Sequence, residues 1–211
     1  MSGITNEWYV FGGGTVDKKT CNKIRRWASK KWESSSVDTS KDTTDEERKT
    51  GKKDDYKSDP KTRISDVAWC NDQWLYDIIF PYMNQANDEA GWRYDIKAAE
   101  SAQITRYKKG GFYNFHHDGM GDHLSTYNDQ TNAFIDGHVR KLSMSVMLND
   151  NFDGGAFEFA SYQKEECTIT SIEATAGSVI VFPSSMEHRV APITKGTRYS
   201  LVIWFVGPPF V

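Results

Sequence analysis

The chain has 211 residues, of which 38% are hydrophobic, and its formal net charge at pH 7 is −3. This length and composition suffice to bury one sizeable core, so we expect residues 1–211 to form a single domain. The small negative charge gives no electrostatic support for nucleic acid as a partner, and no run approaches the roughly 18 apolar residues of a membrane span, so neither partner is expected.

The cysteines and the first residues bear on the cellular compartment. Cys21, Cys70 and Cys167 are far apart, odd in number and contain no Cys-x-x-Cys pair. This pattern favours free thiols in a reducing compartment. The first eight residues lack the basic and apolar segments of a secretion signal, so we expect a cytoplasmic protein.

The first predicted elements are a short apolar run at residues 8–11 and a helix that begins near Thr15 or Asp17. Cys21, Ile24 and Ala28 share one face of this helix at helical spacing. Its other positions carry many basic residues, which are Lys18, Lys19, Lys23, Arg25, Arg26, Lys30 and Lys31. We interpret them as the solvated face of an amphipathic helix.

Residues 34–61 differ sharply in composition from the rest. They are nearly all Ser, Thr, Asp, Glu and Lys, with Val37 and Tyr56 as the larger apolar or aromatic exceptions. Such a segment buries too little surface to order itself alone. It is therefore a flexible insertion or a lid that folds over substrate, and the sequence leaves both readings open.

A second helix is expected to begin after Asp72, with Trp74, Ile78 and Tyr82 on one face, and to stop at Gly91. From there on the pattern changes to strands. They are predicted at residues 92–96, 102–107, 112–116, 142–148, 156–159, 168–172, 178–182 and 198–206. The order predicts an α+β, mainly β fold, in which helices pack outside a rolled β sandwich.

Three residues have the spacing of a metal site. His116 and Asp118 are two residues apart in a predicted strand, so both side chains point to the same face, and His188 follows the apolar strand 178–182. Two imidazoles and one carboxylate on one side of an ion suit Fe(II) and leave open positions for other ligands. Zinc is the commoner metal for a bare histidine pair, but the carboxylate and the anion site described next favour iron.

The predicted strand 198–206 carries that anion site. Arg198, Ser200, Val202 and Trp204 alternate along it and therefore share a face. A guanidinium with a hydroxyl beside it suits the far carboxylate of a small diacid.

Four ordered segments resemble the Fe(II)/2-oxoglutarate-dependent dioxygenases, specifically their prolyl 4-hydroxylase branch. The segments are Tyr107-x-x-Gly110-x-x-Tyr113-x-x-His116-x-Asp118, Gly154-Gly155-x-Phe157-x-Phe159, Phe182-Pro183 ahead of His188, and Arg198-x-Ser200. The resemblance covers residues 102–206 as the catalytic β core. It implies a double-stranded β-helix of the jelly-roll or cupin type.

The resemblance also implies roles for individual residues. His116, Asp118 and His188 match the catalytic iron ligands. Arg198, Ser200 and Tyr107 match the residues that bind 2-oxoglutarate, whereas Arg140 and Trp204 match positions that approach the substrate. Met147 stands where several prolyl hydroxylases have a tyrosine that binds 2-oxoglutarate, so the cosubstrate is expected to depend on the other three residues. The remaining histidines, His117, His123 and His138, are expected to have no direct role.

The implied activity is hydroxylation of a C–H bond, foremost in a prolyl residue of a protein or peptide, with release of succinate and CO2. The cofactors implied are Fe(II), 2-oxoglutarate and O2, with ascorbate as a candidate addition. Another amino-acid side chain, a free amino acid, or a non-catalytic jelly-roll binding module remain as alternatives. Trp204 disfavours the nucleic-acid demethylase branch of the family, in which a second arginine follows six residues after the first. Asp118 disfavours a halogenase, in which this ligand position is vacant.

Overall fold

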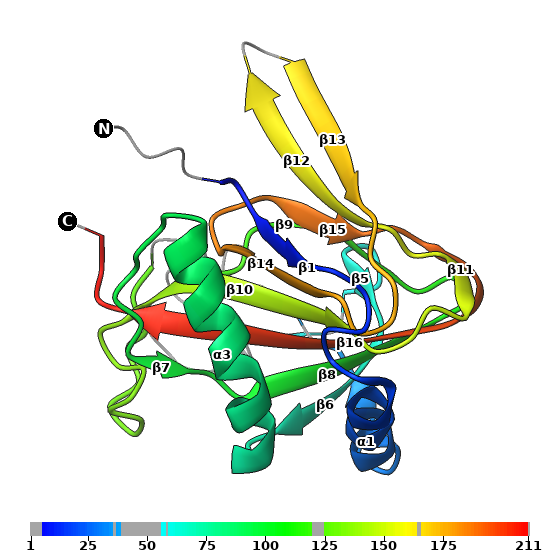
Figure 1. The fold of residues 1–211 in the computed structure, drawn as a ribbon, viewed down its shortest axis with the longest axis horizontal. Coiled ribbons are helices and arrows are strands. Elements are labelled where there is room, and N and C mark those ends of the chain that lie inside the picture. Colours follow the sequence, from blue (N-terminus) through cyan, green and yellow to red (C-terminus); the bar gives the residue numbers. More distant parts are fainter. Residues whose placement is uncertain are drawn as a thin grey trace.

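The structure is a computed structural model, and it describes residues 6–35, 37–38, 56–57, 59–119, 125–163 and 166–210. In this part of the chain two β-sheets face each other, and two helices pack on the outside (Figure 1). The predicted fold class, a mainly β rolled sandwich with supporting helices, is confirmed.

The larger sheet forms the base of the sandwich. In spatial order its main strands are β1 (Tyr9–Phe11), β14 (Val179–Pro183), β10 (Val139–Met147), β16 (Ile193–Gly207), β8 (Ala102–Lys108), β6 (Asp66–Cys70) and β2 (Glu33–Ser34). Two short strands, β7 (Ala98–Ala99) and β11 (Phe152–Gly154), also pair with β16. The strand β16 is thus the central element of the sheet.

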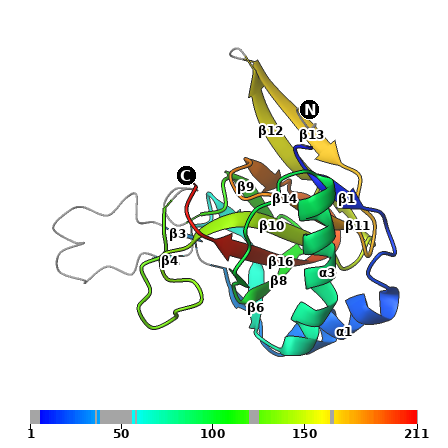
Figure 2. The same ribbon diagram turned by 60° about the vertical axis from the view of Figure 1, so that its left-hand side comes forward.

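The smaller sheet covers one face of the larger one. Its order is β13 (Glu166–Ile172), β12 (Phe157–Gln163), β15 (His188–Val190), β9 (Phe112–His116) and β5 (Arg63–Ile64). The β12–β13 hairpin projects away from the rest of the molecule in both ribbon views (Figure 1, Figure 2). A separate pair joins β3 (Val37–Asp38) to β4 (Tyr56–Lys57).

The two helices, α1 (Lys18–Ala28) and α3 (Gln73–Glu89), cover the other face of the larger sheet (Figure 2). Asp17 caps α1, since its side chain accepts hydrogen bonds from the backbone N–H groups of Lys19 and Thr20. Asp72 precedes α3 as expected but makes no capping bond. Its carboxylate instead accepts hydrogen bonds from the indoles of Trp27 and Trp74, which ties α1 to α3.

The strand β10 lies between two buried regions, the core beneath the helices and the space between the two sheets. Leu142, Met144 and Val146 belong to the core beneath the helices. Ser143 and Ser145 alternate with them and are also buried, but on the side of the smaller sheet. Polar side chains are therefore placed between the sheets, where an active site needs them.

Some predicted elements differ from the structure. Residues 92–96 form no strand; Arg93 adopts a positive φ of 52°, which is incompatible with a regular strand. The strands β5, β6 and β15 were not predicted, because they are short or lack clear alternation. Residues 36, 39–55 and 58, most of the predicted insertion or lid at 34–61, lie outside the described residues.

All three cysteines are free thiols, with Cys21 and Cys70 buried and Cys167 exposed. Within the described part of the chain no helix has the length and apolar character needed to span a bilayer.

Candidate metal centre and cavity

Two neighbouring strands bring the candidate ligands together. His116 on β9 is paired directly with His188 on β15. Asp118 lies in a bend just after β9, not in the strand itself, and its backbone N–H donates to the carbonyl of Ser184. Nε2 of His116 is 3.6 Å from Oδ1 of Asp118, and Nε2 of His188 is 3.5 Å from Oδ2. One ligand atom from each residue lies within 4.8 Å of the others, so the group could hold a metal ion.

Hydrogen bonds orient all three side chains. Nδ1 of His116 lies 2.8 Å from the carbonyl of Asn114, and Nδ1 of His188 lies 2.9 Å from that of Met186. When these Nδ1 atoms carry the proton, each Nε2 lone pair is free to bind a metal. Ser143 donates to Oδ2 of Asp118 at 2.7 Å and lies 2.9 Å from the hydroxyl of Ser184. These outer contacts are typical of a metal centre.

The ionisation states also suit a metal. Burial lowers the pKa of His188 to about 4, with a further contribution from His116, so its imidazole is neutral at pH 7. Burial raises the pKa of Asp118, but the imidazoles of His188 and His116 outweigh it and hold the pKa below its usual value. A neutral imidazole and a charged carboxylate are the forms that bind metal ions.

Aromatic rings enclose the two histidines. The Tyr113 ring stacks on His116 with centroids 3.5 Å apart, and the Phe182 ring meets His188 edge-on at 4.7 Å. Phe157 lies on the same imidazole at 5.5 Å. These contacts hold the rings in place and keep water from that side of the centre.

Arg198 is the largest of the fully buried side chains. Its Nη1 donates to the hydroxyl of Ser200 at 3.1 Å, whereas Nε and Nη2 have no hydrogen-bond partner among the described residues. Burial lowers its pKa to about 10, which leaves it charged at pH 7. The ring of Tyr107 lies 5.6 Å from the guanidinium carbon. A buried, unneutralised guanidinium requires an anion, and a carboxylate fits its geometry.

The glycines of the Gly154-Gly155 segment make room for this arginine. Gly155 has a φ of 66°, which favours glycine. A Cβ atom at this position would clash with Ile193 and approach Cδ of Arg198 to 3.1 Å. The segment thus has a packing role next to the anion site.

A single cavity between the sheets joins these features. It is lined by His116, Asp118 and His188 together with Arg198, Ser200 and Tyr107, and also by Trp204. Among the predicted site residues only Arg140 does not line it. Arg140 makes two hydrogen bonds of 2.6 Å to Glu100, and its guanidinium lies 4.2 Å from the Trp204 ring. Met147 is buried but does not line the cavity either.

The sequence analysis missed four residues at this site. Ser143 and Ser184 support Asp118, Tyr113 stacks on His116, and Arg63 on β5 lines the cavity. Arg63 donates through Nε to Ser65, and its guanidinium lies 4.7 Å from the Tyr113 ring centre. Tyr113 was part of the quoted motif, although no role was assigned to it. Arg63 comes just after the polar segment 34–61, and nothing in that composition indicates a buried residue.

Unpaired donors concentrate in this cavity. In the described ranges, five buried side-chain polar atoms lack a hydrogen-bond partner: Arg63 Nη2, His138 Nδ1, Arg198 Nε, Arg198 Nη2 and Trp204 Nε1. Four of them belong to cavity-lining residues, and all four are donors. The cavity is therefore built for ligands that bring acceptor oxygens.

Two of the other histidines do not line the cavity. His117 is exposed, with Nδ1 2.7 Å from the carbonyl of Ser185, and His138 does not line the cavity. His123 lies outside the described residues.

The family assignment follows from the sequence of this region. Residues 102–206 match the family model described as the 2OG-Fe(II) oxygenase superfamily. The chain belongs to this superfamily. The matched range contains both strands of the candidate metal centre and also Arg198, so it includes the whole of the predicted catalytic β core.

Relatives of this oxygenase include curated bacterial hydroxylases. A PKHD-type hydroxylase of Xylella fastidiosa strain M12 is 33% identical over 104 residues, which are 48% of this chain and 42% of that protein. One of Hyphomonas neptunium is 37% identical over 65 residues, 30% of this chain and 27% of that protein. The match thus spans less than half the length of either relative.

Solved structures share the fold over nearly the whole chain. The viral collagen prolyl hydroxylase of Paramecium bursaria Chlorella virus-1, in its 2OG complex, has a TM-score of 0.60 and 16% identity, and the match covers 96% of this chain and 97% of that one. A prolyl-4-hydroxylase of Pseudomonas putida has a TM-score of 0.61 and 17% identity, with coverage of 95% and 92%. These similarities confirm the predicted jelly-roll fold.

Proposed function

We propose that the chain is an Fe(II)- and 2-oxoglutarate-dependent dioxygenase that hydroxylates a prolyl residue of a protein or peptide. One observation carries the proposal. The three candidate metal ligands and a buried arginine with two unpaired donors line the same cavity. A metal site alone fits many functions. A metal site next to a site for an anion fits a reaction in which a metal ion and an anionic cosubstrate act together.

The donor set fits the proposed groups. His116, Asp118 and His188 would hold Fe(II) by two nitrogens and one carboxylate oxygen. Arg198 and Ser200 would bind the distal carboxylate of 2-oxoglutarate, with Tyr107 closing that end of the cavity. Iron, when bound, supplies the oxidising chemistry, in which a C–H bond, O2 and 2-oxoglutarate become C–OH, succinate and CO2.

The chain's own residues position the reactants and exclude water. Ser143 and the carbonyls of Asn114 and Met186 fix the ligand side chains. The rings of Tyr113, Phe157 and Phe182 make the surroundings apolar, so reactants are shielded from bulk solvent. Trp204 and Arg63 offer donors to acceptor oxygens of the substrate. Arg140 stacks on Trp204 and is proposed to position it.

The choice of prolyl substrate follows the relatives. One solved relative is a prolyl hydroxylase of Trichoplax adhaerens in complex with a hypoxia inducible factor peptide fragment; it has a TM-score of 0.58 and 16% identity, and the match covers 95% of this chain and 84% of that one. Another amino-acid side chain, a free amino acid and a non-catalytic binding module are the competing proposals. Ascorbate as an additional cofactor stays a prediction.

A substrate screen tests this function. Purified protein with Fe(II), ascorbate and 2-oxoglutarate is offered a peptide library and free proline, and added oxygen is located by mass spectrometry. We expect one oxygen on a peptide prolyl residue. Oxygen on free proline alone would favour the small-molecule alternative, and binding without turnover would favour the binding module.

A further inference from the structure

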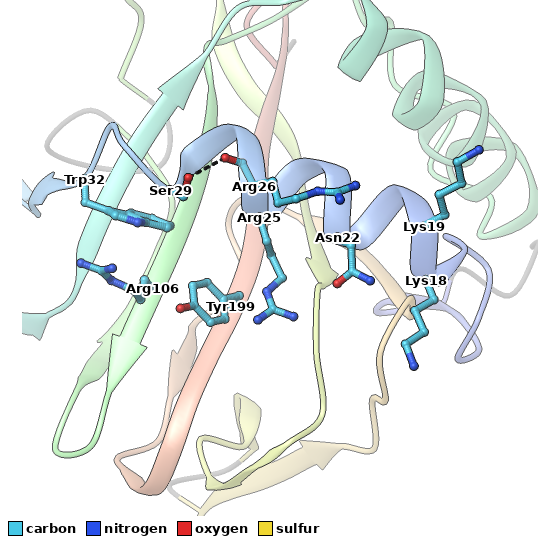
Figure 3. A pocket seen from close by; sticks show the side chains of 9 residues that line it. All are labelled: Lys18, Lys19, Asn22, Arg25, Arg26, Ser29, Trp32, Arg106 and Tyr199. Carbon is cyan, nitrogen blue, oxygen red and sulfur yellow. Dashed lines mark hydrogen bonds between the residues drawn. The ribbon is translucent and has the colours of Figure 1, made fainter.

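A second feature of the molecule is a groove on the helix side of the larger sheet (Figure 3). Its basic lining residues are Lys18, Lys19, Arg25, Arg26 and Arg106, and among the described residues no acidic side chain lines it. Figure 3 shows Arg106 beside Trp32 and Arg25 beside Tyr199, with the two lysines farther along α1. The groove is therefore strongly cationic on a chain whose net charge is −3.

A neighbouring groove shares lining residues with both this surface and the cavity. It is lined by Arg63, Asp66, Arg106, Lys108 and Lys109, together with small and apolar residues. Arg106 lines both grooves, and Arg63 lines both this groove and the cavity. We call the basic residues of the two grooves the basic track. Its members range from the residues of α1 to Arg63, which also lines the cavity of the candidate metal centre.

The charge of the basic track is largely uncompensated. Among the described residues, eight basic side chains line the two grooves against a single carboxylate, that of Asp66. Asp66 pairs with Arg106 at 2.8 Å and with Lys108 at 3.2 Å. In the described part of the chain, the four basic residues of α1 in the groove form no ion pair with a carboxylate. A stripe of like charge in a groove attracts a ligand of opposite charge.

The aromatic rings in the groove favour a polypeptide over a nucleic acid. Proteins that bind single-stranded nucleic acid stack bases on free aromatic faces. Here Arg106 lies over Trp32 and Arg25 over Tyr199, each 4.5 Å from the ring, and the two rings lie 6.1 Å apart. Each guanidinium thus covers one face of its ring, and that face is not open to a base. The same stacking holds the cations in place for carboxylates.

We propose that the basic track binds an acidic segment of the polypeptide substrate, next in sequence to the residue that enters the cavity. This inference rests on the proposed function, and it adds the substrate class: a prolyl-containing chain with a run of Asp or Glu on one side. From Lys18 to Arg25 the helix rises about 10 Å, which is about three residues of an extended peptide. Carboxylates on alternate residues of such a peptide can follow this spacing.

The test measures binding without catalysis. A fluorescein-labelled peptide of alternating Glu and Ser is titrated with metal-free protein, and fluorescence anisotropy gives its Kd. We expect Lys18→Glu/Arg26→Glu to weaken binding at least about tenfold, and salt to weaken binding to the unchanged protein. Failure of the proposed hydroxylation would not affect this readout, because neither iron nor 2-oxoglutarate is present.

The matched control is Lys23→Glu/Lys30→Glu, which makes the same change in net charge on residues that line neither groove. We expect it to weaken binding clearly less than Lys18→Glu/Arg26→Glu does, because its charges lie near the groove but do not line it. Equal weakening in both variants, or no binding to the unchanged protein, would overturn the proposal. Tighter binding of an oligothymidylate with equal charge would contradict the proposal, because the ligand of the basic track would then be a nucleic acid and not an acidic peptide.

Discussion

The hydroxyl of Ser143 donates a 2.7 Å hydrogen bond to Oδ2 of Asp118, and both side chains are buried. The serine lies on the larger sheet and the aspartate follows β9 of the smaller one. This contact therefore fixes the carboxylate across the interface between the sheets. It makes the position of a candidate metal ligand depend on how the two sheets pack.

Replacing this serine should weaken metal binding. We expect Ser143→Ala to lower Fe(II) affinity by about 10- to 100-fold, as losses of such outer contacts do. Anaerobic calorimetry measures the affinity. Ser145→Ala is the matched control, since Ser145 lines the cavity from the same strand but makes no described contact with Asp118. Equal affinity in both variants would show that Ser143 does not position the ligand.

Replacing Arg198 should separate cosubstrate binding from folding. In Arg198→Met we expect no thermal stabilisation by 2-oxoglutarate, whereas the ligand-free protein should be as stable as the unchanged one or more so. The reason is that a buried guanidinium without an anion costs free energy, which methionine avoids. Melting curves with and without 2-oxoglutarate measure both effects. A variant that still responds to 2-oxoglutarate would remove Arg198 from the anion site.

The buried histidine should make metal-free protein sensitive to acid. The pKa of His188 is about 4 in the fold and about 6.5 when unfolded. Between these values the unfolded chain binds the extra proton, so stability falls as pH drops from about 6.5 to about 4, by up to about 3 kcal/mol. Urea unfolding at several pH values measures this. His188→Asn should show a flatter dependence in that range, and an equal slope would assign the effect to other groups.

The ion pair of Arg140 and Glu100 should be important for stability. Both side chains are largely buried, at 14% and 13% exposure. We expect Glu100→Gln to lower the free energy of unfolding by about 3 kcal/mol, because it leaves a buried cation without its partner. The double variant Glu100→Gln/Arg140→Met should recover part of this loss in urea unfolding. Additive losses in the double variant would show that the two groups are not coupled.

Motifs and local patterns predicted much of the molecule. The alternation in residues 142–146 and in 198–204 identified the side chains between the sheets, and the same spacing linked Arg198 to Ser200. The two helices also followed from helical spacing and, for α1, from its cap at Asp17. These features depend on neighbours within a few residues, which a single sequence contains.

Other contacts depend on the packing of distant segments. Ser143 reaches Asp118 from another sheet, and Arg63 enters the cavity from β5, a strand of two residues. Glu100 and Arg140 are separated by 40 residues. Nothing in the local pattern of these residues indicates a partner. The basic face of α1 was interpreted as solvated, because the sequence does not show that it borders a groove with Arg106.

The most direct test of the central claim is succinate formation from 2-oxoglutarate by purified protein with Fe(II) and O2, compared with a folded His188→Ala variant. The unchanged protein should form succinate only when iron is added, and the variant should form none above background. Equal rates in the two proteins, or no succinate from the unchanged one with any substrate offered, would contradict the account.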